Sequence, residues 1–430
     1  MKKKILSMLL SMVLTVACFT GCGSNPSSGG ETGGAASTET PKNPEDMYTV
    51  TMAVIGNDQE DMDLVEAEMN KILAEKVGAQ IDVITLGWGV YQQQLQLMLS
   101  GAEKLDLVPI MYNNVSTYVN SGQVLDMSDL IDQYGVNMKA ALGEDILKIA
   151  NMNGYVYGVP VEKEWYADSC LVMRKDILDK YNLDVSNVKS LADCAPIFET
   201  IHENEPDMKI IVGAKDSLIG NVYFADVLSD RFGVLDNGGA DTTIVNYYET
   251  DNYKNLAATV HDYYEKGYID KDMATSTDAG TTTLKAGNAF CFATPYKPGV
   301  AEQESLNTGY ELVAVRINPT PAFCYTNAVA AITWGIGQNC ENPEMTMKVL
   351  DYMYGDPELM NLFNWGIEGV HYVVKDAEND VIGFPDGVDA SNAKYNLNMG
   401  WELPNQYKIH VWEGSSRKIM DAQKEMNATA

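Results

Sequence analysis

Aromatic rings beside amide and carboxylate groups are the chemically distinctive feature of this chain. Trp88 lies between two glycines, and Trp165 lies between Glu164 and Tyr166. An indole ring can stack on the C–H face of a sugar, while Asn, Asp and Glu bond its hydroxyl groups. The same rings can also fill a hydrophobic core. Other rings at predicted loops or strand ends are Tyr112, Tyr296, Trp334, Trp365 and Trp401.

Sequence motifs of common enzymes are absent. The chain contains no HExxH, GxSxG, GxxxxGKS or GxxxxGKT, and Gly335-Ile336-Gly337 lacks the third small residue of a dinucleotide-binding loop. A glycoside hydrolase needs two carboxyl groups about 5 to 9.5 Å apart. The local sequence marks no such pair among the 60 acidic residues. We therefore predict no catalytic residue, no cofactor and no metal site, with a surface glycoside hydrolase as the enzymatic alternative.

The first 46 residues predict an export signal, a lipid anchor and a tether. Three lysines precede an apolar run from Ile5 to Phe19, which is too short to cross a bilayer core of about 30 Å as a helix. Phe19-Thr20-Gly21-Cys22 is similar to a bacterial lipobox, and plain secretion is the alternative. Gly, Ser, Thr and Asn dominate the following residues, a composition that stays flexible. We expect a signal peptide over 1–21, a lipid such as palmitate on Cys22, and a tether over 22–46.

Charge excludes one class of partner. The chain has a net charge of −30 at pH 7, and loss of residues 1–21 would remove three lysines and no acid, giving −33. A surface this acidic repels nucleic acid, because affinity for phosphate needs clustered Lys or Arg. We therefore predict no nucleic-acid partner. Five cysteines follow Cys22, an odd number without CxxC spacing, so neither a disulfide framework nor a zinc site is expected.

Strands and helices alternate along residues 48–110. Such an alternation favours a parallel sheet covered by helices, which binds ligands at the carboxyl ends of its strands. Three loops are expected there, at Asn57-Asp58, at Trp88 and at Tyr112-Asn113-Asn114. The predicted strands are 48–55, 81–86 and 105–110, and the predicted helices are 61–77 and 91–99.

The segment from Gly154 to Asp176 is expected to carry the chain from one lobe into another. Aromatic and β-branched residues between Gly154 and Gly158 indicate a strand, and 169–173 indicate a second one. The residues between them, from Glu162 to Tyr166, are both polar and aromatic. We expect their side chains to face a gap between the lobes. An ordinary surface hairpin is the alternative.

The chain resembles extracellular solute-binding proteins of ABC importers, in particular the carbohydrate-type family 1. The lipobox, the strand–helix start, Tyr157-Gly158-Val159-Pro160 and the strand leading to Asp176 carry this resemblance. The run from Asn364 to Tyr372, with Pro295 to Gly299 before it, resembles a lipoprotein subgroup for oligosaccharide uptake. Members of that subgroup continue with a further helical region, so we expect the natural chain to be longer.

The resemblance implies an α/β, two-lobed, periplasmic-binding-protein-like (type II) fold with the ligand in a cleft between the lobes. It also implies a monomer that sits on the outer face of the bacterial membrane, captures a saccharide or oligosaccharide and delivers it to the transmembrane subunits of an ABC permease. A peptide ligand and the hydrolase stay as alternatives. We expect lobe 1 at 47–168 plus 325–372, and lobe 2 at 169–324 plus 373–430.

Within that fold, stacking rings and hydrogen-bonding groups are expected from both lobes and from the segment that joins them. No catalytic or metal-binding residue is among them. The expected ligand-binding residues are Asn57, Asp58, Trp88, Tyr112, Asn113, Glu162, Trp165, Tyr223, Tyr296, Trp334 and Trp365.

Overall fold

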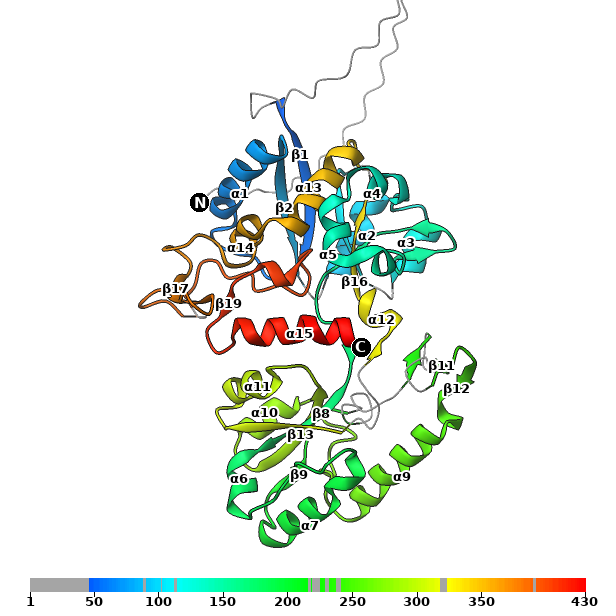
Figure 1. The fold of residues 1–430 in the computed structure, drawn as a ribbon, viewed down its shortest axis with the longest axis vertical. Coiled ribbons are helices and arrows are strands. Elements are labelled where there is room, and N and C mark those ends of the chain that lie inside the picture. The colour runs from blue at the N-terminus through cyan, green and yellow to red at the C-terminus, as the bar shows by residue number, and fades with distance from the viewer. Residues whose placement is uncertain are drawn as a thin grey trace, which may run out of the picture. The chain divides into compact units, whose positions relative to one another are not determined.

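Five strands in the order β2-β1-β3-β16-β6 form the first sheet (Figure 1). The computed structural model describes residues 46–430 except 88–89, 102, 112–113, 216–217, 219–224, 229–231, 237–240, 318–322 and 390–391. β1 is parallel to β2 and β3, which confirms the predicted parallel sheet, whereas β16 is antiparallel to β3 and β6. These strands are β1 (Tyr48–Ile55), β2 (Ala79–Leu86), β3 (Leu107–Met111), β6 (Val159–Pro160) and β16 (Ile332–Ile336).

Helices pack on both faces of this sheet because neighbouring strand residues point to opposite sides. Val50, Met52 and Val54 belong to the larger cluster, with side chains of α1, α13 and α14; we call this cluster the first core. Ala53 points the other way, into a smaller cluster with α2 and α3. The helices around the sheet are α1 (Met62–Lys76), α2 (Tyr91–Ser100), α3 (Val115–Asn120), α4 (Ser128–Tyr134), α5 (Val136–Leu147), α13 (Pro343–Gly355) and α14 (Pro357–Trp365).

Helix α1 shows how the sequence specifies this packing. Met62, Val65, Met69 and Leu73 are its buried residues, a spacing of three or four that lines one face of a helix. After Val77, Gly78 has a φ of 79°, a backbone conformation that favours glycine and ends the helix before β2. The predicted helix over 61–77 is thereby confirmed.

The chain then passes from the first sheet to a second one, as predicted for the segment after Gly154. β6 pairs with β16 of the first sheet, and β8 pairs with β13 and β14 of the second. Between them, β7 pairs with β15, which lies on the returning chain. Two short antiparallel strands therefore lie where the chain crosses in both directions. Their bounds are β7 (Tyr166–Ala167) and β15 (Phe323–Cys324), after a β4 (Asn151–Met152) and β5 (Tyr155–Val156) hairpin.

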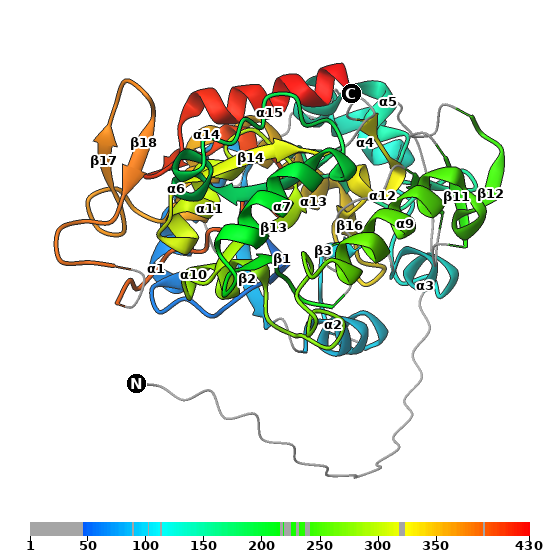
Figure 2. The same cartoon turned by 90° about the horizontal axis from the view of Figure 1, so that it is seen from below.

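The second sheet has the order β14-β8-β13-β9 and its own apolar cluster, the second core. Phe198, Tyr263 and Phe290 form edge-to-face ring contacts inside it. Figure 2 shows the helices gathered around this sheet. The elements are β8 (Ser169–Arg174), β9 (Lys209–Ile211), β13 (Ala289–Pro295), β14 (Leu312–Arg316), α6 (Lys175–Lys180), η3 (Leu191–Cys194), α7 (Ala195–Asn204), α9 (Asp251–Glu265), α10 (Gly280–Lys285) and α11 (Val300–Thr308).

Shorter elements complete the described fold. β10, β11 and β12 form a small antiparallel sheet. Cys170, Cys194, Cys291, Cys324 and Cys340 are all free thiols, and the first three are buried. Within the described part of the chain, no helix combines the length and the apolar character needed to cross a membrane. The bounds are β10 (Asp226–Val227), β11 (Gly233–Leu235), β12 (Ile244–Asn246), η5 (Tyr247–Glu249) and α12 (Thr326–Val329).

The segment after residue 372 packs differently from the expectation that placed it in lobe 2. Ile382, Tyr395, Leu403 and Ile409 belong to the first core. The hydroxyl group of Tyr395 donates to the main-chain oxygen of Phe363 at the end of α14. Such side-chain partners come from far along the chain, and no local pattern shows them. The elements of this segment are β17 (Val373–Asp376), β18 (Val381–Gly383), η6 (Gln406–Lys408), β19 (Val411–Trp412) and α15 (Arg417–Thr429).

Helix α15 has contacts in three places. Near its start, Arg417 forms an ion pair with Asp380, which lies between β17 and β18. In its middle, Gln423 donates to the main-chain oxygen of Pro298, just before α11. Near its end, Asn427 donates to the oxygen of Lys163 and accepts from the N–H of Trp165. The helix therefore contacts the segment after β17, the loop before α11 and the chain between the two sheets.

Candidate ligand-binding site

A polar cavity of about 540 Å³ lies at the carboxyl end of β1. β1 ends at Ile55, and the loop after it contributes Asn57 and Asp58, both exposed. The opposite wall is formed by the chain around Asn396 and Asn398, with the ring of Trp412 beside it. We call this space the polar cavity. Its remaining lining residues are Gln59, Glu60, Phe384, Ala393 and Lys394.

Direct contacts hold the two walls of the polar cavity together. The amide oxygen of Gln59 accepts from the N–H of Asn396 at 2.8 Å, and the N–H of Asp61 donates to the oxygen of Lys394 at 3.2 Å. At the rim, the Lys394 ammonium lies 3.0 Å from the carboxylate of Glu60. Both groups of that ion pair are largely exposed, so it contributes little stability. The two hydrogen bonds therefore hold the walls together around residues 59–61 and 394–396.

A second, aromatic cavity of about 370 Å³ adjoins the first, because Asn398 and Trp412 line both. Its rings are Trp365, Trp401 and Trp412, and the centroids of Trp365 and Trp412 lie 4.9 Å apart with a tilt of 32°. The other lining residues come from the segment between the two sheets, from α11 and the residues just before it, from the 400–415 segment and from α15. They are Glu164, Lys297, Gln303, Gly400, Gln406, Ile409, His410, Val411, Ser415, Met420 and Gln423.

The carboxylate of Glu164 and the ammonium of Lys297 are charged groups at the wall of the aromatic cavity. Burial on its own would raise the pKa of this carboxyl, but the charges of Lys297 and Lys163 and a hydrogen bond from Gln406 outweigh it, so the pKa is lowered. Gln406 donates to Glu164 at 2.6 Å, and the Lys297 ammonium lies 3.6 Å away. Glu164 is therefore ionised at neutral pH and cannot serve as the proton donor of a hydrolase.

Three predicted ligand-binding residues line these cavities. Asn57 and Asp58 line the polar cavity, and Trp365 lines the aromatic cavity. Trp365 offers little of its face, because it is 4% exposed and its ring N–H donates to the oxygen of His410 at 3.1 Å. These three residues stay predictions for ligand binding.

Three other predicted residues lie away from the lining of both cavities. Glu162 is buried beneath α15, with one carboxylate oxygen 2.8 Å from the ammonium of Lys424. Trp165 packs in the first core, and its ring N–H donates to the oxygen of Val161 at 2.9 Å. Tyr296 is half-buried in the second sheet's smaller cluster, with the guanidinium of Arg316 5.2 Å from its ring centroid.

Trp334 is a core residue in this structure, contrary to its expected role in stacking. It lies on β16, whose residues are all buried, and its own exposure is 0%. Its ring N–H donates to the main-chain oxygen of Glu402 at 2.8 Å. A ring without exposed surface cannot stack on a ligand, so we do not carry Trp334 into the proposed site. Trp88, Tyr112, Asn113, Tyr223 and Cys22 lie outside the described residues.

Replacing Trp334 by Phe should lower stability and should reduce ligand affinity far less than loss of an exposed ring of the site does. The substitution shortens the ring and leaves the oxygen of Glu402 without its donor, which we expect to cost about 2 kcal/mol. Urea unfolding measures the loss of stability, and calorimetric titration with a bound saccharide measures affinity. A large fall in affinity together with unchanged stability would return Trp334 to the binding site.

The sequence analysis did not predict several of the residues that line the cavities. Trp412, Asn396 and Asn398 were not predicted, although Trp401 was noted as a ring in a loop. The stretch Tyr395-Asn-Leu-Asn-Met-Gly-Trp401 has the same mixture of rings and amides that singled out Trp165. The signal was therefore present.

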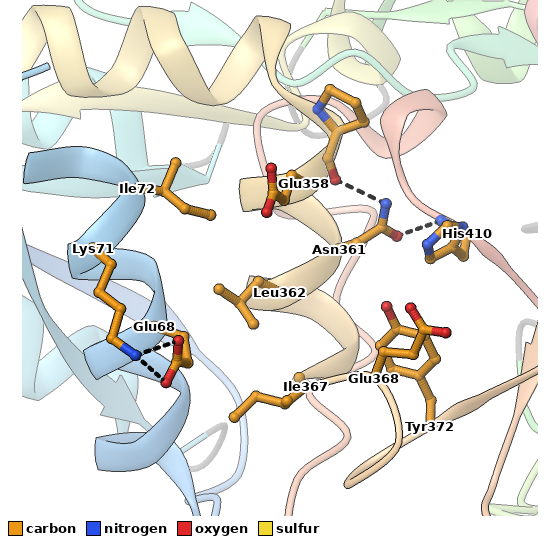
Figure 3. Close-up of a pocket in the computed structure, with 12 residues that line it drawn as sticks. Glu68, Lys71, Ile72, Glu358, Asn361, Leu362, Ile367, Glu368, Tyr372 and His410 are labelled. Carbon is orange, nitrogen blue, oxygen red and sulfur yellow. Dashed lines mark hydrogen bonds and ion pairs between the residues drawn. The ribbon is translucent and has the colours of Figure 1, made fainter. Parts of the chain in front are cut away.

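A further cavity, of about 630 Å³, lies between α1 and α14 (Figure 3). Figure 3 shows Lys71 bonded to Glu68, and Asn361 between the oxygen of Pro357 and the N–H of His410. Among its described lining residues, the one Tyr or Trp is Tyr372, which is 6% exposed. None of its described lining residues belongs to the first sheet or to the loops at the carboxyl ends of its parallel strands. We therefore prefer the polar and aromatic cavities as the ligand site.

Comparisons with solved structures confirm the predicted fold class. The N-glycan transport solute binding protein NgtS from Streptococcus pneumoniae superposes with a TM-score of 0.77 at 26% identity, over 89% of this chain and 83% of that one. The alginate-binding protein AlgQ2 has a TM-score of 0.59 at 17% identity, over 91% and 83% of the two chains. The fold is thus a mixed α/β periplasmic-binding-protein fold.

Sequence comparison gives the family. A carbohydrate ABC transporter substrate-binding protein of Streptococcus pneumoniae is 28% identical over 385 residues, which are 89% of this chain and 76% of that protein. The family model for bacterial extracellular solute-binding proteins matches residues 56–359. Such proteins bind a solute and do no chemistry on it, which agrees with the prediction that the chain is not an enzyme. With most of its length matched, the chain belongs to the bacterial extracellular solute-binding protein family.

Proposed function

We propose that this protein is a solute-binding protein that captures a neutral oligosaccharide and delivers it to an ABC transporter. The observation that carries the proposal is the pair of adjoining cavities, one lined by amides and carboxylates and one by three indole rings. Rings that stack on sugar faces and polar groups that bond hydroxyls are the two requirements of saccharide binding. The two cavities share Asn398 and Trp412, which suits a ligand of more than one sugar unit.

Relatives support the saccharide class. NgtS is described in complex with Man1GlcNAc and with Man5GlcNAc. The Streptococcus pneumoniae relative is named for carbohydrate transport. By this analogy the partner of the protein is the transmembrane part of a carbohydrate ABC transporter. The proposed anchor is a lipid on Cys22, which holds the binding domain near that partner through the tether of residues 22–46.

The charges around the cavities favour a neutral ligand. Lys394 is paired with Glu60, and Lys297 lies beside Glu164. Both lysines that line the cavities thus already face a carboxylate, and Asp58 adds a further negative charge. A uronic or sialic acid would need a cation to balance its carboxylate, and repulsion by the lining acids would oppose it. We therefore expect neutral saccharides to bind better than acidic ones.

The first test is a thermal-shift screen of the purified protein with Man5GlcNAc, Man1GlcNAc, acidic oligosaccharides and peptides. A ligand bound only by the folded state stabilises it by about 2.7 kcal/mol at a hundredfold excess over Kd. We expect a higher Tm with a neutral oligosaccharide that is recovered intact. Release of smaller sugars would support the hydrolase instead, and a response to peptides alone would overturn the saccharide proposal.

A further inference from the structure

Glu402 carries a buried carboxyl group and follows, in the sequence, the residues that form one wall of the polar cavity. Its side chain is fully buried, and one oxygen accepts from the N–H of Ile55, the last residue of β1, at 2.8 Å. The other oxygen has no hydrogen-bond partner among the described residues. Burying a carboxyl group for a single hydrogen bond is unfavourable compared with burying an apolar side chain. A group kept at such a cost has a role that an apolar residue of the same size would not fill.

The hydrogen bond to Ile55 occupies a specific place in the sheet. The next residue, Gly56, donates its N–H to the oxygen of Leu86 on β2. Successive N–H groups of a strand point to opposite sides, so the N–H of Ile55 faces away from β2. On that side β1 is paired with β3 at Met52 and Leu107, three residues earlier. Glu402 thus supplies the acceptor for the N–H of Ile55, at a point of β1 beyond its pairing with β3.

The main chain around Glu402 is held just as firmly. Its oxygen accepts from the ring of Trp334 at 2.8 Å, and its N–H donates to the oxygen of Met399 at 2.8 Å. Asn364, with 0% exposure, bonds the N–H of Met399 through its amide oxygen and the N–H of Asn398 through its main-chain oxygen. The 396–403 segment is therefore fixed to α14 and β16, and its carboxyl group reaches from there to β1.

These contacts connect the two walls of the polar cavity. Asn57 and Asp58 follow Ile55 by two and three residues, and Asn396 and Asn398 precede Glu402 by six and four. The bonds between Gln59 and Asn396 and between Asp61 and Lys394 also link the walls. The Lys394–Glu60 pair is exposed, whereas the bond from Ile55 to Glu402 is shielded from water. A hydrogen bond that is shielded from water keeps its geometry better than an exposed ion pair does, because water does not compete for its groups.

We propose that Glu402 is the positioning residue of the ligand site, because its carboxyl group joins the end of β1 to the 396–403 segment and sets the distance between the walls. It touches no ligand itself. This inference rests on the proposed function, in which a saccharide is bound between those walls. Ligand affinity should then depend on the acceptor oxygen of residue 402 and not on its negative charge.

Two substitutions of similar size distinguish the role of the acceptor oxygen of residue 402 from the role of its negative charge. Glu402→Gln keeps an oxygen for the N–H of Ile55, and Glu402→Leu removes it. We expect the Gln variant to bind Man5GlcNAc within about threefold of the unchanged protein, and the Leu variant to bind it at least about tenfold more weakly in calorimetric titration. Equal affinity of the Leu variant, or equal loss in the Gln variant, would overturn the proposal.

A control separates positioning from general loss of stability. Asp351 on α13 also has a buried carboxyl group, and it lines neither cavity. It accepts from the N–H groups of Asn137 and Met138. Asp351→Ala should lower the Tm and leave the affinity unchanged. A loss of affinity in this variant matching that of Glu402→Leu would mean that destabilisation alone explains the effect.

Amide hydrogen exchange tests the same inference without any saccharide. In Glu402→Leu, exchange should become faster in residues 55–61 and 396–403, while Glu402→Gln and Asp351→Ala leave these segments protected. Unchanged exchange there in the Leu variant would overturn the positioning role. If the unchanged protein binds neither Man5GlcNAc nor Man1GlcNAc, the oligosaccharide proposal fails, and the exchange result still decides the role of Glu402.

Discussion

Replacing Trp412 by Ala should reduce saccharide affinity by about ten- to a hundredfold, the largest effect we expect from one ring of the site. Trp412 lines both cavities and is half-buried, so part of its face is open to a ligand. Trp365 supports it at a centroid distance of 4.9 Å, and Phe384 meets it edge-on at 4.7 Å. Loss of one large stacking surface costs about 1–3 kcal/mol, which corresponds to that range of affinity.

Calorimetric titration with the oligosaccharide identified by thermal shift measures this effect. Trp412→Phe should recover part of the affinity, because a smaller ring still offers a flat face. Trp334→Phe is a second comparison, since it alters an indole without exposed surface and should reduce affinity far less than Trp412→Ala does. Wild-type affinity in Trp412→Ala would remove the aromatic cavity from the proposed site.

The first sheet could be predicted because its signals are local. In α1, the three-to-four spacing of apolar residues defines the helix and its buried face, and β1 before it is a run of β-branched and apolar residues that ends before Gly56. The same local reasoning also placed Asn57 and Asp58 at the strand end, where the polar cavity lies. Residues next to a predicted strand end are thus accessible to sequence analysis.

The rest of the site depends on contacts between distant residues. From Phe384 to Asn405 the chain has neither strand nor helix in its described part, so no periodicity reveals which side is buried. Its position comes from partners such as Phe363 for Tyr395 and Ile55 for Glu402. Trp334 illustrates the opposite difficulty, because it was predicted to bind the ligand and lies in the core. A strand buried on both faces has no polar face to tell a core ring from a binding ring.

Glu402 should also make the stability of the protein depend on pH. Burial raises the pKa of this carboxyl from its ordinary value of 4.5 to about 8, and the bond from the N–H of Ile55 only partly opposes the shift. The folded protein therefore keeps a proton that the unfolded chain releases above pH 4.5. In the window from 4.5 to 8 the unfolded state binds fewer protons, so the free energy of unfolding falls as pH rises.

The magnitude follows from the size of the shift. Each pKa unit corresponds to about 1.4 kcal/mol, so the group should remove about 4 kcal/mol of stability between pH 5 and pH 8, and little more above pH 8. Glu402→Gln lacks this proton but has nearly the same size. Its free energy of unfolding, relative to that of the unchanged protein, should therefore rise by about 4 kcal/mol over the same range.

Urea unfolding of both proteins at pH 5, 6, 7 and 8 measures this difference. Other titrating groups act equally in the two proteins, so only the contribution of residue 402 remains in the comparison. Two parallel curves would mean that the carboxyl is ionised in the folded protein at neutral pH, with a second donor at its other oxygen. A growing difference together with unchanged saccharide affinity in Glu402→Gln would show that the acceptor oxygen, and not the charge, is what the site uses, which is the separation on which the positioning role depends.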